Sequence, residues 1–195
     1  MPLLAEEVKS RIETAEPGIA MKVFRNSILL EKPEDLLRAA AFLKSAPDFR
    51  MDYLASVTAV DYLKYLESVY HLYSIEKKTG PVVLRVRVPR KDPRIPSLVG
   101  LYRGAELQER ENYDLFGIVY EGHPDLRRLF LWETFEGHPL RKDYVQEDSE
   151  VLEAADIEWL DRHGISSPKE VRQHALELRK QGKRAVAEKD GKEGA

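Results

Sequence analysis

The stretch SVYHLYSIEKKTGPVVLRVRV, residues 68–88, decides the fold of this chain. Aromatic and β-branched side chains alternate with polar ones in its first half, and residues 82–88 repeat the pattern with Arg85 and Arg87 on one face. A period of two with these residue types is typical of β-strands. Residues 77–80 predict a turn, so the stretch is expected to form a β-hairpin.

Further strands are expected before this hairpin. Residues 53–62 are rich in β-branched and aromatic side chains, and two short apolar runs at 19–24 and 27–30 are separated by Arg25 and Asn26. Asparagine tolerates a positive φ. We therefore expect a second hairpin with Asn26 in that conformation.

Two helices are expected on the N-terminal side of the long hairpin. Apolar residues spaced by four predict one helix over 3–15, closed by Pro17 and Gly18. Another is expected to begin at Pro33 and to end at Pro47. The order of helix, two strands, helix and three strands predicts an α+β two-layer sandwich, with helices on one face of a largely antiparallel sheet.

A third helix is predicted over 104–116, after a proline-rich loop. Glu106, Arg110 and Asp114 are spaced by four and can pair along one helix face, and Gly117 supplies a stop signal. A carboxylate pair within 109–114 could serve acid/base catalysis, but a charged helix face is the favoured interpretation.

The residues after this helix have a different character. Residues 118–148 show little periodicity, yet their apolar content argues against disorder and for cover by a partner. The predicted organisation is an α+β domain at 1–117, an extended partner-binding arm at 118–148, a helical tail at 149–181 with helices at 151–163 and about 168–180, and a disordered end at 182–195.

Composition excludes several classes of function. The 195 residues, 43% of them hydrophobic, suffice for one packed domain with an extension, and the formal net charge of -3 gives no reason to expect nucleic-acid binding. The chain has no cysteine, which excludes a thiolate-held cluster and a disulfide. Apolar runs fall far below the ~20 residues of a membrane span, and early acidic residues do not fit a targeting peptide, so a cytosolic location is expected.

The tetrapeptide Glu-Gly-His-Pro occurs twice, at 121–124 and 136–139. His123 and His138 could ligate a metal with a nearby aspartate, but their spacing matches no established zinc pattern. A ring nitrogen bonded to a backbone group is the favoured interpretation, and no metal is predicted.

Paired basic residues follow each repeat at 127–128 and 141–142. Guanidinium groups suit phosphate, but neither Gly122 nor Gly137 opens a helix as in a phosphate-binding loop. These cations are interpreted as docking groups for another protein.

Three spaced blocks carry a resemblance to a known family: ERENYDLFGI (109–118), GHPDLRR (122–128) and EGHPLRKDY (136–144). In order and separation they resemble the signature of the C-type subunit of NADH–quinone oxidoreductase, respiratory complex I. The resemblance implies a peripheral-arm subunit that performs no catalysis alone and binds no cofactor.

The same resemblance implies the partners and the contact residues. The chain would pack on the D-type subunit and other hydrophilic-arm subunits, near the quinone site and terminal iron–sulfur cluster of an ion-translocating complex. Iron–sulfur clusters, flavin and quinone are expected in partner subunits, and the membrane is reached only indirectly, on its cytoplasmic face. The implied partner contacts are His123, Arg127, Arg128, His138, Arg141, Lys142 and Asp143, with Glu109, Arg110 and Asp114 as support for the arm.

Two alternatives stay open from the sequence. Relatives of the C-type subunit also occur in membrane-bound hydrogenases and in ferredoxin- or deazaflavin-dependent complexes, where other subunits set the electron donor and acceptor. A free-standing metal enzyme using His123 and His138 is the more remote alternative.

Overall fold

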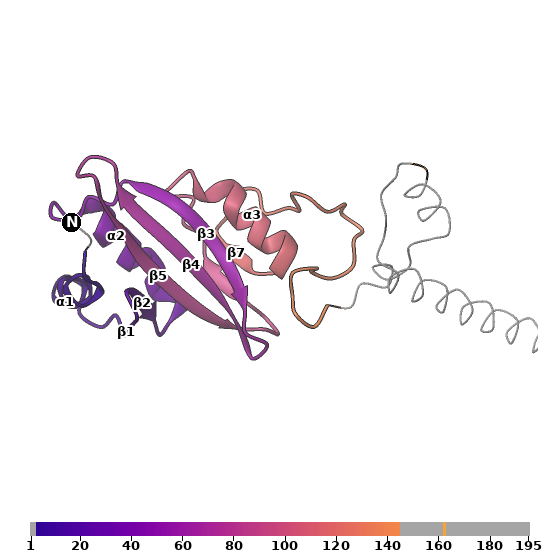
Figure 1. Cartoon of the computed structure of the whole chain (residues 1–195), viewed down its shortest axis with the longest axis horizontal. Helices are drawn as coiled ribbons and strands as arrows, with labels where there is room; N and C mark the ends of the chain where they lie inside the picture. Colours follow the sequence, from indigo (N-terminus) through magenta and orange to yellow (C-terminus); the bar gives the residue numbers. More distant parts are fainter. Residues whose placement is uncertain (1–2, 145–161, 163–195) are drawn as a thin grey trace, which may run out of the picture. The chain divides into compact units, whose positions relative to one another are not determined.

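The computed structural model describes residues 3–144 and Arg162, and its elements are shown in Figure 1. Residues 3–144 belong to one compact unit. The main sheet contains β1 (Met21–Phe24), β2 (Ser27–Leu30), β3 (Tyr53–Asp61), β4 (Tyr65–Ser74) and β5 (Thr79–Pro89). The helices are α1 (Ala5–Ala15), the 3-10 helix η1 (Pro33–Asp35), α2 (Leu36–Ser45) and α3 (Ala105–Phe116), and two short strands, β6 (Arg94–Pro96) and β7 (Val119–Glu121), pair separately.

The five-stranded sheet has the order β1-β2-β5-β4-β3. Neighbouring strands are antiparallel except β2 and β5, which run parallel. The parallel pair arises because η1 and α2 carry the chain from β2 to β3 at the far edge, and β5 then returns beside β2. The helices and the mixed sheet confirm the predicted α+β sandwich.

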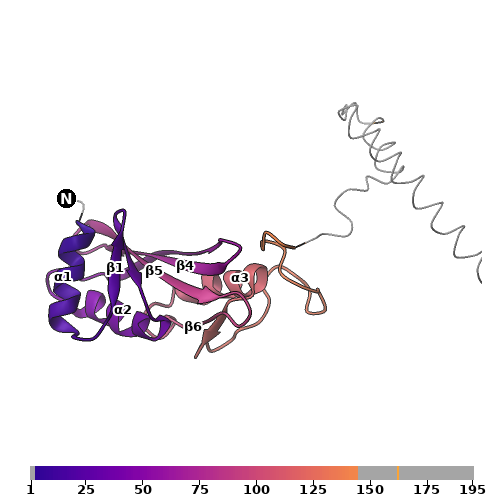
Figure 2. The ribbon, with the colours of Figure 1, turned by 90° about the horizontal axis from the view of Figure 1, so that it is seen from below.

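Alternate side chains of β4 and β5 point to opposite faces of the sheet. Leu66, Tyr70 and Leu84 are fully buried, in the same core as Val8 of α1 and Leu43 of α2. Figure 2 shows α1 and α2 close together on one side of the sheet. The hydrophobic core therefore lies between these helices and the sheet.

The two short strands were not predicted. β6 lies in the proline-rich segment, and β7 lies within the predicted arm, where Ile118 is 0% and Tyr120 is 1% exposed. The Tyr120 hydroxyl lies 3.1 Å from Ser68 Oγ on β4. The first residues of the predicted arm thus belong to the core, and the arm is defined below as residues 122–144.

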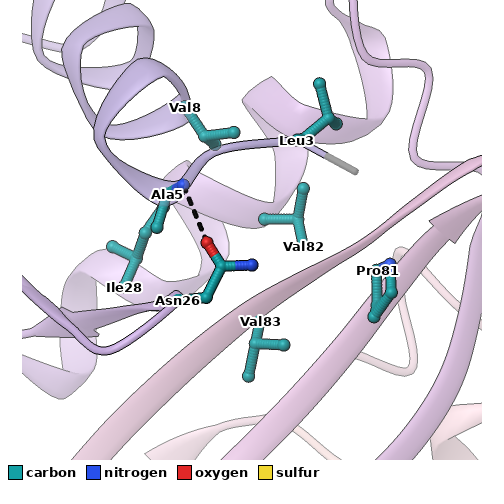
Figure 3. Close-up of a pocket in the computed structure, with 8 residues that line it drawn as sticks. All are labelled: Leu3, Ala5, Val8, Asn26, Ile28, Pro81, Val82 and Val83. Carbon is teal, nitrogen blue, oxygen red and sulfur yellow. Dashed lines mark hydrogen bonds between the residues drawn. The ribbon is translucent and has the colours of Figure 1, made fainter. Parts of the chain in front are cut away.

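The turn between β1 and β2 differs from its prediction in one detail. The positive φ, 55°, belongs to Arg25 rather than to Asn26. Asn26 Oδ1 instead accepts a hydrogen bond of 3.2 Å from the backbone N–H of Ala5, which satisfies one donor at the start of α1. Figure 3 shows this bond beside a small pocket between α1, this turn and β5, lined by Leu3, Ala5, Val8, Asn26, Ile28, Pro81, Val82 and Val83.

The predicted helices at 151–163 and 168–180, the disordered end at 182–195 and the last four residues of the predicted arm lie outside the described residues. In the part of the chain that the structure describes, no helix has the length and hydropathy needed to cross a membrane.

Candidate protein-interaction site

Asp114 is the centre of the contact between α3 and the arm. Its side chain is 0% exposed, and its Oδ2 accepts hydrogen bonds from the backbone N–H groups of Leu129 (3.0 Å), Phe130 (2.8 Å) and Leu131 (3.0 Å). Three consecutive N–H groups converge on one oxygen only if the backbone curls around it. The carboxylate thus accepts the backbone hydrogen bonds that carbonyl groups would accept if this segment were a helix or a strand.

Arginines from both sides complete this contact. Arg128 Nη1 donates to Asp114 Oδ1 at 2.8 Å, and its Nη2 donates to the carbonyl of Phe135 at 2.8 Å. Arg110 of α3 donates from Nε and Nη2 to the carbonyls of Arg127 (3.2 Å) and Arg128 (3.0 Å). Guanidinium forks are suited to such double contacts. The arm is therefore held mainly by charged groups on irregular backbone.

These hydrogen bonds set the ionisation of Asp114. Burial alone would raise the pKa of its carboxyl, but the donors on Leu131, Arg128, Phe130 and Leu129 outweigh burial and lower the pKa to about 2. Asp114 is therefore ionised at neutral pH, and its bonds to the arm are charge-assisted.

Each Glu-Gly-His-Pro repeat places its histidine ring on a backbone carbonyl of α3. His123 Nε2 donates to Glu106 O at 3.0 Å, while its Nδ1 accepts from the backbone N–H of Asp125 at 3.0 Å. His138 Nδ1 donates to Asp114 O at 2.9 Å. These bonds confirm that the rings tie down backbone groups.

The second repeat requires a glycine at the end of α3. Gly117 has φ +72°, and a Cβ there would overlap the ring of His138 and lie 2.8 Å from Arg141 Nη2. Burial lowers the pKa of His138, and the charges of Arg141 and Arg128 act in the same direction. Gly117 thus ends the helix and also makes room for the returning arm.

The end of the arm is fastened to the sheet by residues that sequence reasoning missed. Asp61, at the end of β3, accepts a hydrogen bond of 2.8 Å from the backbone N–H of Lys142. Arg90, just after β5, pairs with both Asp61 and Asp143. Although burial opposes the Asp61 charge, the N–H of Lys142 and the Arg90 guanidinium lower the pKa of Asp61. Nothing local in the sequence joins residues so far apart in the chain.

Arg141 is bonded through only one of its nitrogens. Its Nε donates to the carbonyl of Phe116 at 2.6 Å, at the last turn of α3. Among residues 3–144, neither terminal nitrogen of Arg141 has a hydrogen-bond acceptor. Burial lowers the pKa of Arg141. Its free Nη pair could receive a carboxylate from another polypeptide.

Glu109 has a different role from the other two predicted support residues. Its Oε2 accepts a hydrogen bond from Ser97 Oγ at 2.6 Å, and its Oε1 accepts one from the backbone N–H of Leu98 at 2.7 Å. Burial raises the pKa of Glu109 to about 7, against the opposing effect of these two donors. Glu109 therefore holds the connection between β6 and α3, whereas Arg110 and Asp114 hold the arm.

Residues 109–114 form a charged helix face as predicted, but most of its charged groups are buried. Glu109 and Asp114 are 0% exposed and Arg110 is 6% exposed. The spacing by four of Glu106, Arg110 and Asp114 correctly predicted a helix, but Arg110 and Asp114 bind the arm rather than one another. The arm buries this part of α3.

The remaining predicted contact residues are Arg127, Lys142 and Asp143, and all three are exposed. Arg127 Nε forms an ion pair of 3.0 Å with Asp125, two residues earlier. Such exposed pairs contribute little to stability. These three side chains are accessible to a partner.

Apolar side chains of the arm also point to solvent. Phe130 and Trp132 are each 65% exposed, and Leu140 is 52% exposed. The Trp132 ring packs edge-to-face on Phe135 at 5.0 Å, and Phe135 stacks on Tyr144 at 6.1 Å. The arm thus uses its polar atoms internally and presents aromatic and aliphatic groups outward, as interface segments do.

The fold and the arm together have the composition of a protein-interaction module. Within residues 3–144, no group of three or more His, Asp and Glu side chains could hold a metal ion. An α+β domain carries a braced arm with exposed aromatic groups, which is the composition of a docking surface.

Comparison with known proteins identifies the family. Residues 29–150 match the family described as respiratory-chain NADH dehydrogenase, 30 Kd subunit. The C-type subunit of NADH-quinone oxidoreductase from Roseiflexus sp. (strain RS-1) is 44% identical over 142 residues, which are 70% of this chain and 81% of that protein. One of the C-type subunits of the same enzyme from Rhizobium meliloti (strain 1021) is 42% identical over 118 residues, which are 57% of this chain and 62% of that protein.

One solved structure is also similar. A chain in the structure of the membrane-bound sulfane sulfur reductase, an archaeal respiratory membrane complex, is 25% identical with a TM-score of 0.55, covering 84% of this chain and 96% of that chain. The present chain belongs to the 30 kDa subunit family, the C-type subunits of complex I-like assemblies.

Proposed function

We propose that the arm docks this chain on the D-type subunit of its complex, with Phe130, Trp132 and Leu140 as apolar anchors. The observation that supports this most directly is that these side chains are exposed on a segment whose backbone is already held by Asp114 and Arg128. A preorganised segment loses little conformational entropy on binding. Its exposed aromatic groups then contribute their burial to affinity.

The polar contacts of this docking surface are proposed at its edge. Arg127, Lys142 and Asp143 are exposed, and Arg141 has a free Nη pair. His123, Arg128 and His138 instead act on docking through the shape of the arm, because their polar atoms bind its own backbone or α3. In this assignment the charged side chains determine the orientation in which the arm docks, and the aromatic groups supply most of the affinity.

The chain acts in this proposal as a non-catalytic structural subunit, placed peripherally at the cytoplasmic face of the membrane through its partners. The partner would hold the quinone site near the terminal iron–sulfur cluster of an ion-translocating complex, and iron–sulfur clusters, flavin and quinone would be bound by other subunits. The similarity to the sulfane sulfur reductase chain favours one second candidate, the equivalent subunit of a related respiratory or hydrogenase complex without quinone.

Trp132→Ala tests the docking proposal, with Leu107→Ala as its control. Leu107 is 56% exposed on α3, outside the arm. We expect Trp132→Ala to weaken binding to the purified D-type subunit by about 30-fold, the effect of losing an aromatic anchor. The control should bind as the wild type does, and both variants should unfold at the wild-type temperature. Unchanged binding by a double Phe130→Ala, Trp132→Ala variant would refute the proposal.

A further inference from the structure

The face of the sheet opposite to α1 and α2 has an unusual composition. In Figure 1 the strands β3, β4 and β5 lie toward the viewer, with no described element across them. We define the outer sheet face by Tyr65, Glu67, Val69, His71, Tyr73, Val83, Arg85 and Arg87. These residues alternate with buried core residues along β4 and β5. A sheet face in water normally carries mostly polar side chains, whereas four of these eight are aromatic or aliphatic.

The charged groups on this face form one cluster. Glu67 is 1% exposed and accepts hydrogen bonds from Arg85 Nη1 at 2.6 Å and Arg87 Nε at 2.8 Å. Arg85 is also fixed by its Nε, which donates to Ser27 Oγ at 2.9 Å. Two guanidinium groups share one carboxylate whose oxygens are both occupied. The cluster therefore has a formal charge of +1, although the whole chain carries -3.

Arg87 is held so that its outer edge stays free. Its guanidinium lies 4.7 Å from the ring centroid of Tyr65, which stacks on Tyr62 at 5.0 Å. Its Nε is bonded to Glu67, but within residues 3–144 neither of its terminal nitrogens has an acceptor. The side chain is 38% exposed. A guanidinium fixed on one edge and on its face can bind a carboxylate with little loss of side-chain entropy.

A second polar group on this face also has no partner. His71 pairs with Val83 across β4 and β5, and its buried Nδ1 has no hydrogen-bond partner in the described part of the chain. Buried polar atoms in native proteins are normally satisfied. The open Arg87 edge and this imidazole nitrogen thus lie on one face, among Val69, Tyr73 and Val83.

From this juxtaposition we propose that the outer sheet face is a second protein-binding surface, which receives a carboxylate-bearing segment of another subunit on Arg87 and Arg85. The net positive cluster selects a carboxylate, and the flanking aromatic and aliphatic side chains select a polypeptide with apolar neighbours. A nucleic acid is disfavoured because the chain is acidic as a whole. This surface goes beyond the docking of the arm and shares no residue with it.

Hydroxyl-radical footprinting tests whether the face is covered. Oxidation of Tyr65 and Tyr73 is measured in the free full-length chain and in the intact native complex. We expect at least about fivefold slower oxidation of both tyrosines in the complex, because a protein interface excludes solvent from its core. Equal oxidation rates in the two samples overturn the proposal. If both rates are fast, the face is uncovered in the complex, and if both are slow, the chain covers this face itself.

Arg87→Gln tests the carboxylate, with Arg94→Gln as the matched control. Arg94 is an exposed arginine on β6, paired with Asp92 outside the outer sheet face. We expect Arg87→Gln to leave the unfolding temperature of the free chain unchanged, since Arg85 still neutralises Glu67. In a salt titration of the native complex, the apparent dissociation constant of Arg87→Gln should be about 10-fold higher than that of wild type. The dissociation constant of Arg94→Gln should equal that of wild type.

The two surfaces can be separated by comparing variants. Trp132→Ala should leave the protection of Tyr65 and Tyr73 unchanged in whatever complex still forms. Unchanged binding by the Phe130→Ala, Trp132→Ala double variant would refute the docking of the arm and leave the proposal for the outer sheet face standing. Protection of the tyrosines without any effect of Arg87→Gln would show that the face is covered but that no carboxylate is bound, which overturns the proposed carboxylate site.

Discussion

The sheet and the arm satisfy the same physical requirements in opposite ways. In the sheet, strand ladders pair the backbone groups and apolar side chains such as Leu66 and Leu84 are buried. In the arm, charged side chains such as Asp114 and Arg128 pair the backbone groups, while Phe130 remains exposed. The arm is therefore stabilised by its polar atoms and leaves several of its apolar side chains exposed.

Asp114→Ala should have the largest effect, and it should be confined to the arm. The substitution leaves Arg128 and three backbone N–H groups without their acceptor, and breaking such a buried pair costs about 3–5 kcal/mol. We expect the amides of Leu129, Phe130 and Leu131 to exchange at nearly the rate of an unstructured peptide.

Exchange in β4 and β5 is the internal control for Asp114→Ala. These amides should keep their wild-type protection, because their ladder does not involve the arm. If they lost protection together with the arm, the two regions would unfold as one unit. The sheet and the arm would then not be stabilised independently.

Leu43→Ala should produce the reverse pattern. Leu43 is 0% exposed in the core beneath α2, and truncating a buried leucine costs about 2–5 kcal/mol. Chemical denaturation should show this loss in the free energy of unfolding of the free chain. The exposed Leu37 of α2 provides the matched control, since Leu37→Ala removes the same atoms from a side chain that is 38% exposed. An equal loss in both variants would show that the core lies elsewhere.

Sequence reasoning predicted the sheet but missed most internal contacts of the arm, and both outcomes have the same cause. Periodicity reports which side chains of a regular element face a core, and it predicted the long hairpin at 68–88. The arm has no period, because its contacts join single residues such as Asp61 and Lys142 that are 81 positions apart. Residue type marks its histidines and arginines as candidates for contacts. Whether they face inward or outward depends on the folded position of α3, which no local pattern contains.

Glu109→Gln should remove a pH dependence of stability that belongs to the core. The ordinary pKa of Glu109 is 4.5, and burial raises it to about 7 in the folded chain. Between these values the unfolded chain releases the proton and the folded chain retains it. Stability therefore falls as the pH rises from 4.5 to about 7, by roughly 3 kcal/mol, and is constant above that range. The difference in unfolding free energy between wild type and Glu109→Gln should follow this curve.

Asp114 should show the opposite sign on the same helix. Its folded pKa of about 2 lies below its ordinary 3.8, so its contribution is complete above pH 3.8 and is lost as the pH falls towards 2. The protection of the arm amides, relative to the exchange rate of an unstructured peptide at the same pH, should therefore fall as the pH drops below 3.8. For Glu109, the opposite result would be an unfolding free energy with the same pH profile in Glu109→Gln and wild type between pH 4.5 and 7. That result would show that Glu109 is not a neutral buried carboxyl.

Arg141→Ala should have the smallest effect on the free chain and a clear effect on assembly. Within the chain it removes one hydrogen bond, from Nε to the carbonyl of Phe116, so we expect a loss of about 1 kcal/mol or less in unfolding free energy. In the complex it removes the free Nη pair, and losing a charge-assisted bond to a partner carboxylate costs about 1.5–3 kcal/mol. Binding to the D-type subunit should weaken by about 10-fold or more. Arg141→Lys keeps the charge but not the fork, so an intermediate affinity would show that geometry matters. An unfolded Arg141→Ala chain, or undiminished binding, would place Arg141 with the internal supports of the arm and not with its docking groups.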